Sequence, residues 1–120
     1  MSERGLADSL QWAVLVPALL GLVLGTIQTG IWLHGRTVAS DAALAAAEEV
    51  AWSRSTDAEA RAVAEGIAAD GGVVGVSVRI DRTGALVEVR VSGRVTTFFD
   101  VGQGSLSEVA VLPLERASRP

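Results

Sequence analysis

Residues 12–33 read WAVLVPALLGLVLGTIQTGIWL and contain no charged side chain. At a rise of 1.5 Å per residue, a helix of this length can cross the hydrocarbon core of a bilayer, which is roughly 30 Å thick. The apolar region of a cleavable signal peptide is shorter, about 7–15 residues. A domain of this size could hardly bury such a helix on every side. The stretch therefore predicts a transmembrane helix over residues 12–33.

The predicted span has marked ends and a candidate packing face. Trp12 and Trp32 bracket it, as expected of tryptophan rings that settle at the two headgroup levels. Pro17 lies one turn inside and permits a kink, because its missing N–H leaves one carbonyl without a donor. Gly21 and Gly25 form a G-x-x-x-G pattern, which lets a second helix approach closely, although glycine is common in membrane helices in general.

Length decides the expected orientation, because the flanking charges are nearly balanced. Arg4 precedes the span and Arg36 follows it. Residues 1–11, MSERGLADSLQ, form a short polar segment that is expected to stay in the cytoplasm as a disordered tail. The 34–120 segment is expected to be translocated. The chain is thus predicted to be a single-pass protein of the cytoplasmic membrane with its C-terminal domain outside.

Composition excludes several function classes. The chain has 120 residues, a net charge of −4 and no cysteine, so neither a nucleic-acid partner nor disulfide, thiol or zinc–thiolate chemistry is expected.

The single histidine, His34, lies at the predicted membrane boundary, where an interfacial role is expected. Glu48 and Glu49 diverge by about 100° on a helix and do not form a carboxylate pair. Residues 102–104, Gly-Gln-Gly, read as a turn. We therefore expect no catalytic, cofactor-binding or metal site, no small-molecule substrate and no enzymatic activity.

Residues 34–70 are predicted to form an extended helical region. The Ala-rich sequence from Gly35 to about Arg54 has no proline, so the membrane helix should continue into it. Thr56 and Glu59 then form a capping box that starts a second helix, and Gly71-Gly72 ends it. The first helix is predicted to bury a shallow stripe of Val38, Ala42, Ala45, Glu49 and Trp52 with Leu44, Ala47 and Ala51 beside it, and the second to bury Ala60, Val63, Ala64, Ile67 and Ala68.

Residues 71–120 are predicted to form a small antiparallel sheet. Valines alternate with polar residues or glycine in VVGVSVRI at 73–80 and in ALVEVRV at 85–91, which indicates a β-hairpin with one apolar face. A turn centred on Arg82 and Thr83 would pair Val78 with Val87. Residues 95–99 could prolong the second strand, and residues 100–104 read as a loop. A third strand is expected over 108–114, where a proline suits a strand end, followed by a frayed tail.

Together these elements predict an α+β fold. The membrane helix continues into the Ala-rich helix, a second short helix follows, and a three-stranded antiparallel sheet packs on the helices. The hairpin cannot be stable alone in water, so its valine face must be covered by the helices.

Two segments carry a resemblance to a known family. Residues 4–5, R-G, and 10–17, L-Q-W-A-V-L-V-P, resemble the TadE-like family of the Tad (tight adherence, Flp-type) pilus system, whose members typically read R-G-x-x-A-V-E-F-A-L-V-L-P. Residues 39–51, A-S-D-A-A-L-A-A-A-E-E-V-A, are similar to the family's Ala-rich stretch. The resemblance implies a type IV pilin-like pseudopilin or assembly protein. Its implied partners are other pilin-like subunits and the pilus assembly machinery.

The chain departs from the family pattern at two positions. Gln11 stands where pilin-like proteins place an acidic residue, six positions before Pro17. Gly5, after which a prepilin peptidase would cut, lies one residue farther from that position than in the family.

Two other functions fit the sequence as well. One is a membrane-anchored extracytoplasmic domain that binds an unidentified envelope partner, and the other is a secreted domain released by cleavage after Ser40.

Overall fold

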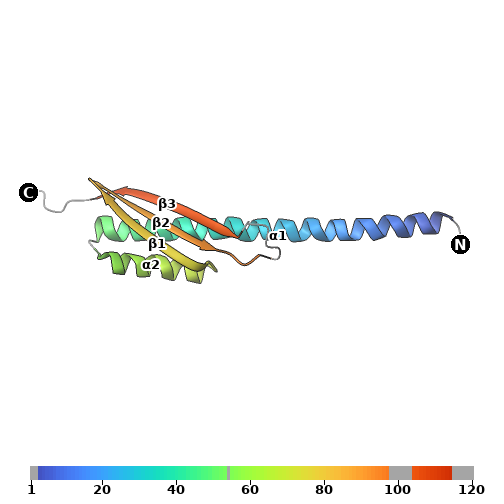
Figure 1. Cartoon of the computed structure of the whole chain (residues 1–120), viewed down its shortest axis with the longest axis horizontal. Helices are drawn as coiled ribbons and strands as arrows, with labels where there is room; N and C mark the ends of the chain where they lie inside the picture. The colour runs from blue at the N-terminus through green and yellow to red at the C-terminus, as the bar shows by residue number, and fades with distance from the viewer. Residues whose placement is uncertain (1–2, 54, 98–103, 115–120) are drawn as a thin grey trace, which may run out of the picture. The chain divides into compact units, whose positions relative to one another are not determined.

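The computed structural model describes residues 3–53, 55–97 and 104–114. The elements follow in the order α1 (Glu3–Trp52), α2 (Asp57–Asp70), β1 (Val74–Thr83), β2 (Leu86–Arg94) and β3 (Ser105–Pro113) (Figure 1). The chain divides into two compact units, Met1–Gly30 and Ile31–Pro120, and α1 contributes to both. We call the second unit the head. The predicted α+β class is confirmed, with a long apolar helix, a short helix and a three-stranded antiparallel sheet.

Helix α1 begins earlier than the sequence suggested. The structure is helical from Glu3, so the expectation of a disordered tail is wrong for residues 3–11. Alanine, leucine and glutamate in this segment are good helix formers, and adding residues to an existing helix avoids the cost of nucleation. Pro17 lies inside α1, which continues on both sides of it.

Helix α2 begins and ends at the predicted residues. Thr56 is its N-cap, and the Thr56 hydroxyl oxygen accepts a hydrogen bond of 3.2 Å from the Glu59 N–H. Gly71 is the C-cap and donates its N–H to the Ile67 carbonyl, while Gly72 follows with a φ of 88°. The predicted inward face is confirmed, with Ala60, Ala64 and Ala68 fully buried. Val63 and Ile67 are half-buried beside them.

The buried face of α1 in the head differs from the predicted stripe. Trp52 and Leu44 are exposed, at 57% and 42%, although both were expected at or beside the buried stripe. The buried positions are smaller residues, which let the sheet and α2 lie close to the helix axis. The predicted stripe is therefore confirmed at Val38, Ala42, Ala47 and Ala51, and it is wrong at Leu44 and Trp52. The residues of α1 buried in the core are Val38, Ala39, Ala42, Ala43, Ala46, Ala47, Val50 and Ala51.

The β1–β2 hairpin forms with a different register from the predicted one. Val78 pairs with Val91 and Ile80 with Val89, whereas the predicted partner of Val78 was Val87. The turn lies at residues 84–85, after the Thr83–Leu86 pair, because Gly84 adopts a φ of 59° that favours glycine. The change moves the turn by two residues, so every side chain keeps its predicted face of the sheet.

Strand β3 starts before the predicted position, at Ser105, and pairs antiparallel with β2 in the sheet order β1-β2-β3. Pro113 closes β3 at an edge of the sheet, as expected. β2 ends at Arg94, and Val95 to Thr97 form no strand, so that part of the predicted extension is wrong. The Val95 N–H still donates to the Gly104 carbonyl at 2.9 Å. The rest of the predicted extension and loop, 98–103, and the predicted tail, 115–120, lie outside the described residues.

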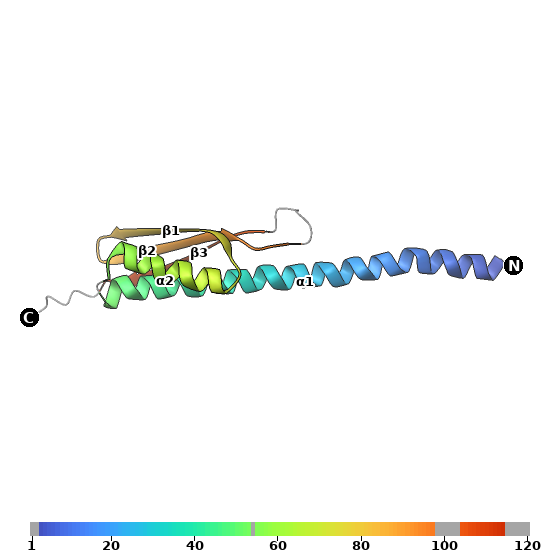
Figure 2. The ribbon, with the colours of Figure 1, turned by 90° about the horizontal axis from the view of Figure 1, so that it is seen from below.

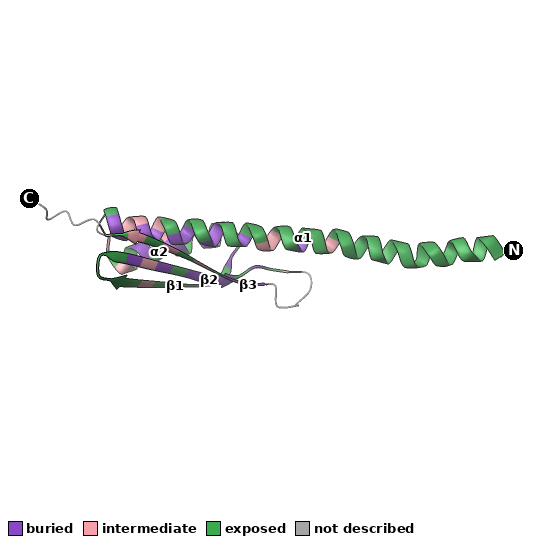
Figure 3. Cartoon of the chain, turned by 90° about the horizontal axis from the view of Figure 1, so that it is seen from above, coloured by how far each residue is buried: buried purple, intermediate pink, exposed green. Residues whose placement is uncertain are grey.

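The core of the head lies between two layers, the sheet on one side and the helices on the other (Figure 2). Val87, Val89 and Val91 of the central strand β2 are its largest fully buried side chains. Burial follows the side of α1 that faces the sheet (Figure 3). The valine face predicted from the alternation is therefore confirmed as the core face of the sheet.

Candidate membrane and assembly surface

The first unit exposes an apolar helix around its whole circumference. Among the described residues, α1 is the one helix long and apolar enough to cross a membrane, and its most apolar 18-residue window has no buried residue. Figure 3 shows this part of α1 as almost continuously exposed. An apolar surface of this extent is unfavourable in water, so it requires lipid or other apolar helices. Its large exposed side chains are Leu6, Leu10, Trp12, Val14, Leu15, Val16, Leu19, Leu20, Leu22, Val23 and Ile27.

Pro17, Gly21, Gly25 and Thr29 follow one another at intervals of four and so share one side of α1. We call this set the small-residue stripe. A β-carbon placed at Gly21 or Gly25 would meet no atom within 4 Å, so the backbone is open to a close neighbour there. Thr29 was missed by the sequence analysis, although its spacing from Gly25 places it on the stripe.

The hydroxyl groups in this segment are compatible with an apolar environment. The Thr29 hydroxyl donates to the Gly25 carbonyl at 2.9 Å, and the Thr26 hydroxyl donates to the Leu22 carbonyl at 2.8 Å. Each donor is therefore satisfied within the helix, which removes most of the cost of placing it in lipid. Gln28 lies between them and is 3% exposed.

The two N-terminal candidates lie on the same helix but apart from the stripe. Gly5 is exposed in the first turn of α1, and Gln11 is exposed about two turns further on. Gln11 is rotated from Pro17 by about 240° around the helix axis, because six residues separate them. The fold therefore does not bring Gly5, Gln11 and the small-residue stripe together.

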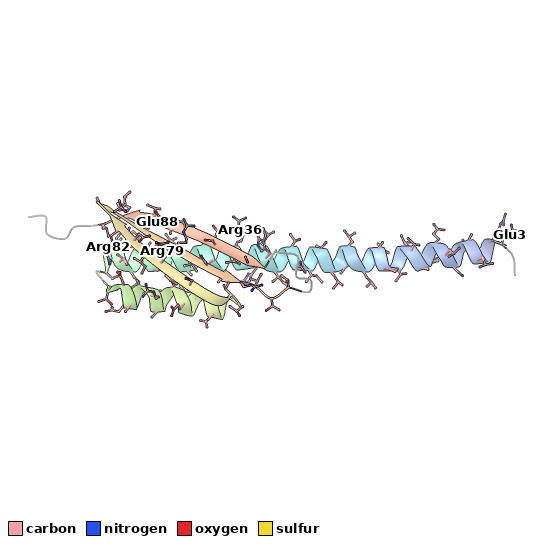
Figure 4. The ribbon with its side chains drawn as sticks, in the orientation of Figure 1. Glu3, Arg36, Arg79, Arg82 and Glu88 are labelled. Atoms are coloured by element: carbon pink, nitrogen blue, oxygen red, sulfur yellow. The ribbon has the colours of Figure 1, made fainter. Side chains whose placement is uncertain are left out.

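The head begins with a polar connection between α1 and the start of β3. The Trp32 indole N–H donates to the Ser105 carbonyl at 3.4 Å, and the Arg36 guanidinium lies 5.0 Å from the centre of the Trp32 ring. Arg36, whose side chain is labelled in Figure 4, also donates its Nε–H to Glu108 Oε1 at 2.6 Å. Trp32, which was expected to mark the membrane surface, is thus half-buried against the head. The exposed apolar segment ends before it.

His34 lines a mostly apolar cavity of about 280 Å³ in the head, together with Ile31, Gly71, Gly72, Val95, Thr96 and Thr97. Among residues 3–53, 55–97 and 104–114 there is no cluster of three or more histidine, aspartate or glutamate side chains that could hold a metal ion.

The comparison with protein families matches the part of the chain that carries the apolar helix. A family model described as TadE-like protein matches residues 7–48. Residues 7–48 are similar to the TadE-like family. The predicted resemblance is thereby confirmed over this segment, which contains the small-residue stripe and the start of the Ala-rich face. It indicates a component associated with the Tad pilus. No curated protein and no solved structure matches the chain.

Proposed function

We propose that this chain is a non-enzymatic, pilin-like component of a Tad pilus assembly or secretion system, anchored in the cytoplasmic membrane by one helix. The head lies outside the membrane, and the TadE-like segment packs against the helices of other pilin-like subunits. The observation that carries the proposal is the fully exposed apolar helix with an open stripe of small residues. In lipid there is no hydrophobic drive between helices, so close backbone approach must supply the affinity.

The placement of Ser40 argues against release of a secreted domain. The bond after Ser40 lies inside α1, and the preceding residues Val38 and Ala39 are buried in the core of the head. Cleavage there would remove core side chains and the Arg36–Glu108 ion pair. Processing after Gly5 would leave the head intact, and we propose this bond as the site for a prepilin peptidase.

The proposal is tested by filling the small-residue stripe. We expect Gly21→Leu with Gly25→Leu to abolish surface piliation in a deletion strain, because two leucines hold the neighbouring helix away from the backbone. The matched control is Val23→Leu with Ile27→Leu, which has the same spacing on another side of the helix and should assemble normally. Membrane extraction of both variants confirms that insertion is unchanged.

Full piliation by the Gly21 and Gly25 double variant would contradict the proposal. If replacing residues 12–33 by an unrelated span of equal length also restored function, the membrane-anchored binding domain would be the better interpretation. Only the head would then be required for function.

A further inference from the structure

Among the described residues no strand pairs with the outer edge of β3, and the outward groups of this edge can be identified. The Val95 N–H bonds the Gly104 carbonyl, and the Leu114 N–H bonds the Ala85 carbonyl, both in the β2–β3 register. In an antiparallel ladder the bonding direction alternates along a strand. Even-numbered residues of β3 therefore turn their N–H and C=O groups toward β2, and odd-numbered residues turn theirs outward. We call the outward backbone of Ser107, Val109 and Val111 the β3 edge.

The two edges of the sheet differ in how well they are protected. On β1 the register is irregular between Val74 and Ser77, where Gly75 has a φ of 61°, and charged side chains follow along the strand. On β3 the pairing with β2 runs without irregularity from Ser105 to Pro113. Its single charge, Glu108, points to the helix layer and is neutralised by Arg36. Bulges and charges are the usual protection of an edge strand, so β1 is protected and β3 is open.

A groove lies beside the β3 edge. It has a volume of about 350 Å³ and is lined by Leu33, Arg36, Thr37, Ser40, Asp41 and Glu108. A strand added to β3 would lie about 4.8 Å away, over this groove. It would cover Leu33, which is 50% exposed, and would extend the outer sheet face at Val109 and Val111. The Asp41 carboxylate forms no ion pair within the described part of the chain and favours a basic neighbour.

The direction of β3 limits which strand can be added. Ser105, the first residue of β3, lies beside Trp32, so β3 runs from that end of the head toward the end at Pro113. Antiparallel pairing is the more stable arrangement per residue. An added strand is therefore expected to run in the opposite direction, from the Pro113 end of β3 toward Ser105.

We propose that the β3 edge receives an extended segment of another polypeptide, paired antiparallel to β3, with apolar side chains at alternate positions and a basic residue facing Asp41. Main-chain hydrogen bonds supply the affinity in this mode of recognition, and the groove supplies selectivity. Neither the availability of the β3 edge nor the direction of the added strand depends on the proposed function, because both come from the hydrogen bonds within the head.

The test uses the full chain in lipid nanodiscs and a synthetic peptide, LVEVRVSGR, which is the sequence of β2 and is known here to pair antiparallel with β3. Amide hydrogen exchange is followed by NMR. We expect peptide to slow exchange at Ser107, Val109 and Val111 at least tenfold, and to leave Leu106 and Ala110, which already bond β2, unchanged. This alternation is read on the unaltered protein, so it does not depend on the folding of any variant.

Two variants at one position separate the backbone from the side chain. Val109→Pro removes an outward N–H without touching the β2 ladder and should abolish the protection, whereas Val109→Ala keeps the N–H and should retain it. Asp41→Asn should weaken binding of the peptide, which carries two arginines, by about two- to fivefold.

Several results would overturn the proposal. These are no protection at millimolar peptide, equal binding by Val109→Pro, or protection of β1 amides in place of β3 amides. Protection that rises with protein concentration alone would assign the edge to a second copy instead. Unchanged affinity in Asp41→Asn would overturn the basic character of the partner. No pilus is involved in this measurement, so its failure is distinct from failure of the proposed function.

Discussion

At the scale of single residues, the head depends on small side chains at the places where α1 meets the sheet and α2. A β-carbon at Gly35 would collide with the side chains of Val95 and Leu106, and one at Gly71 would collide with Val38. At Gly66, on the exposed side of α2, a β-carbon would meet nothing within 4 Å. Gly35 and Gly71 therefore leave room for the side chains packed against them, whereas Gly66 has no such neighbour.

We expect Gly35→Ala to lower the free energy of unfolding of the head by about 1–3 kcal/mol, because the added methyl overfills a closed contact. Gly66→Ala should be neutral or stabilising by up to about 1 kcal/mol, since alanine is the better helix former. Pulse proteolysis in urea, with the full chain in detergent micelles, measures both values. Equal stability of the two variants would contradict the packing at Gly35.

At the scale of elements, the hairpin shows how much freedom the alternating pattern leaves. The valines determine which face of each strand is buried, but several registers satisfy that requirement equally well. The observed pairing of Ile80 with Val89 is selected by the turn, which lies where Gly84 can adopt a positive φ. The valines therefore specify which face of the hairpin is buried, whereas Gly84 specifies the register.

The position of the turn can be tested by substitution. We expect Gly84→Val to cost about 1–2 kcal/mol, because a β-branched residue is strained at a φ of 59°. Thr83→Val should be nearly neutral, since Thr83 is a strand residue paired with Leu86. Thermal unfolding, monitored through the hydrogen exchange of the β2 amides, measures the difference in stability between the two variants. A costly Thr83→Val with a tolerated Gly84→Val would place the turn at residues 82–83 instead.

At the scale of the whole molecule, α1 serves two units with different requirements. From Trp12 to Ile27 its surface is mostly apolar and exposed, whereas from Ile31 it forms part of the core of the head. The head therefore includes the last residues of the predicted span. Ile31 and Trp32 pack against its core, and Arg36 joins α1 to β3.

This division predicts where the chain can be shortened. A variant beginning at Ile31 should give a folded, water-soluble head, because it keeps every buried residue of the core. A variant beginning at Asp41 should fail to fold, since it lacks Gly35, Val38 and Ala39 and the Arg36–Glu108 ion pair. Size-exclusion chromatography and the dispersion of amide NMR signals distinguish the two outcomes. A folded protein beginning at Asp41 would revive the secreted-domain hypothesis.

The sequence alone determined the features that depend on neighbouring residues. The charge-free span, the capping box at Thr56 and Glu59, the end of α2 at Gly71 and the alternation in β1 and β2 all rest on local chemistry, and each is present in the structure. The resemblance of residues 7–48 to the TadE-like family was also readable from the sequence, because its motif is contiguous.

Only the tertiary structure decided features that join distant parts of the chain. The buried face of α1 depends on the sheet and on α2, so Trp52 and Leu44 could not be assigned from the helix alone. The Arg36–Glu108 pair and the free β3 edge depend on strand order, which no local pattern encodes. Of the candidate site, Gly21 and Gly25 were found from spacing, whereas the end of the exposed helix at Gly30 was visible only once the head was assembled around Ile31 and Trp32.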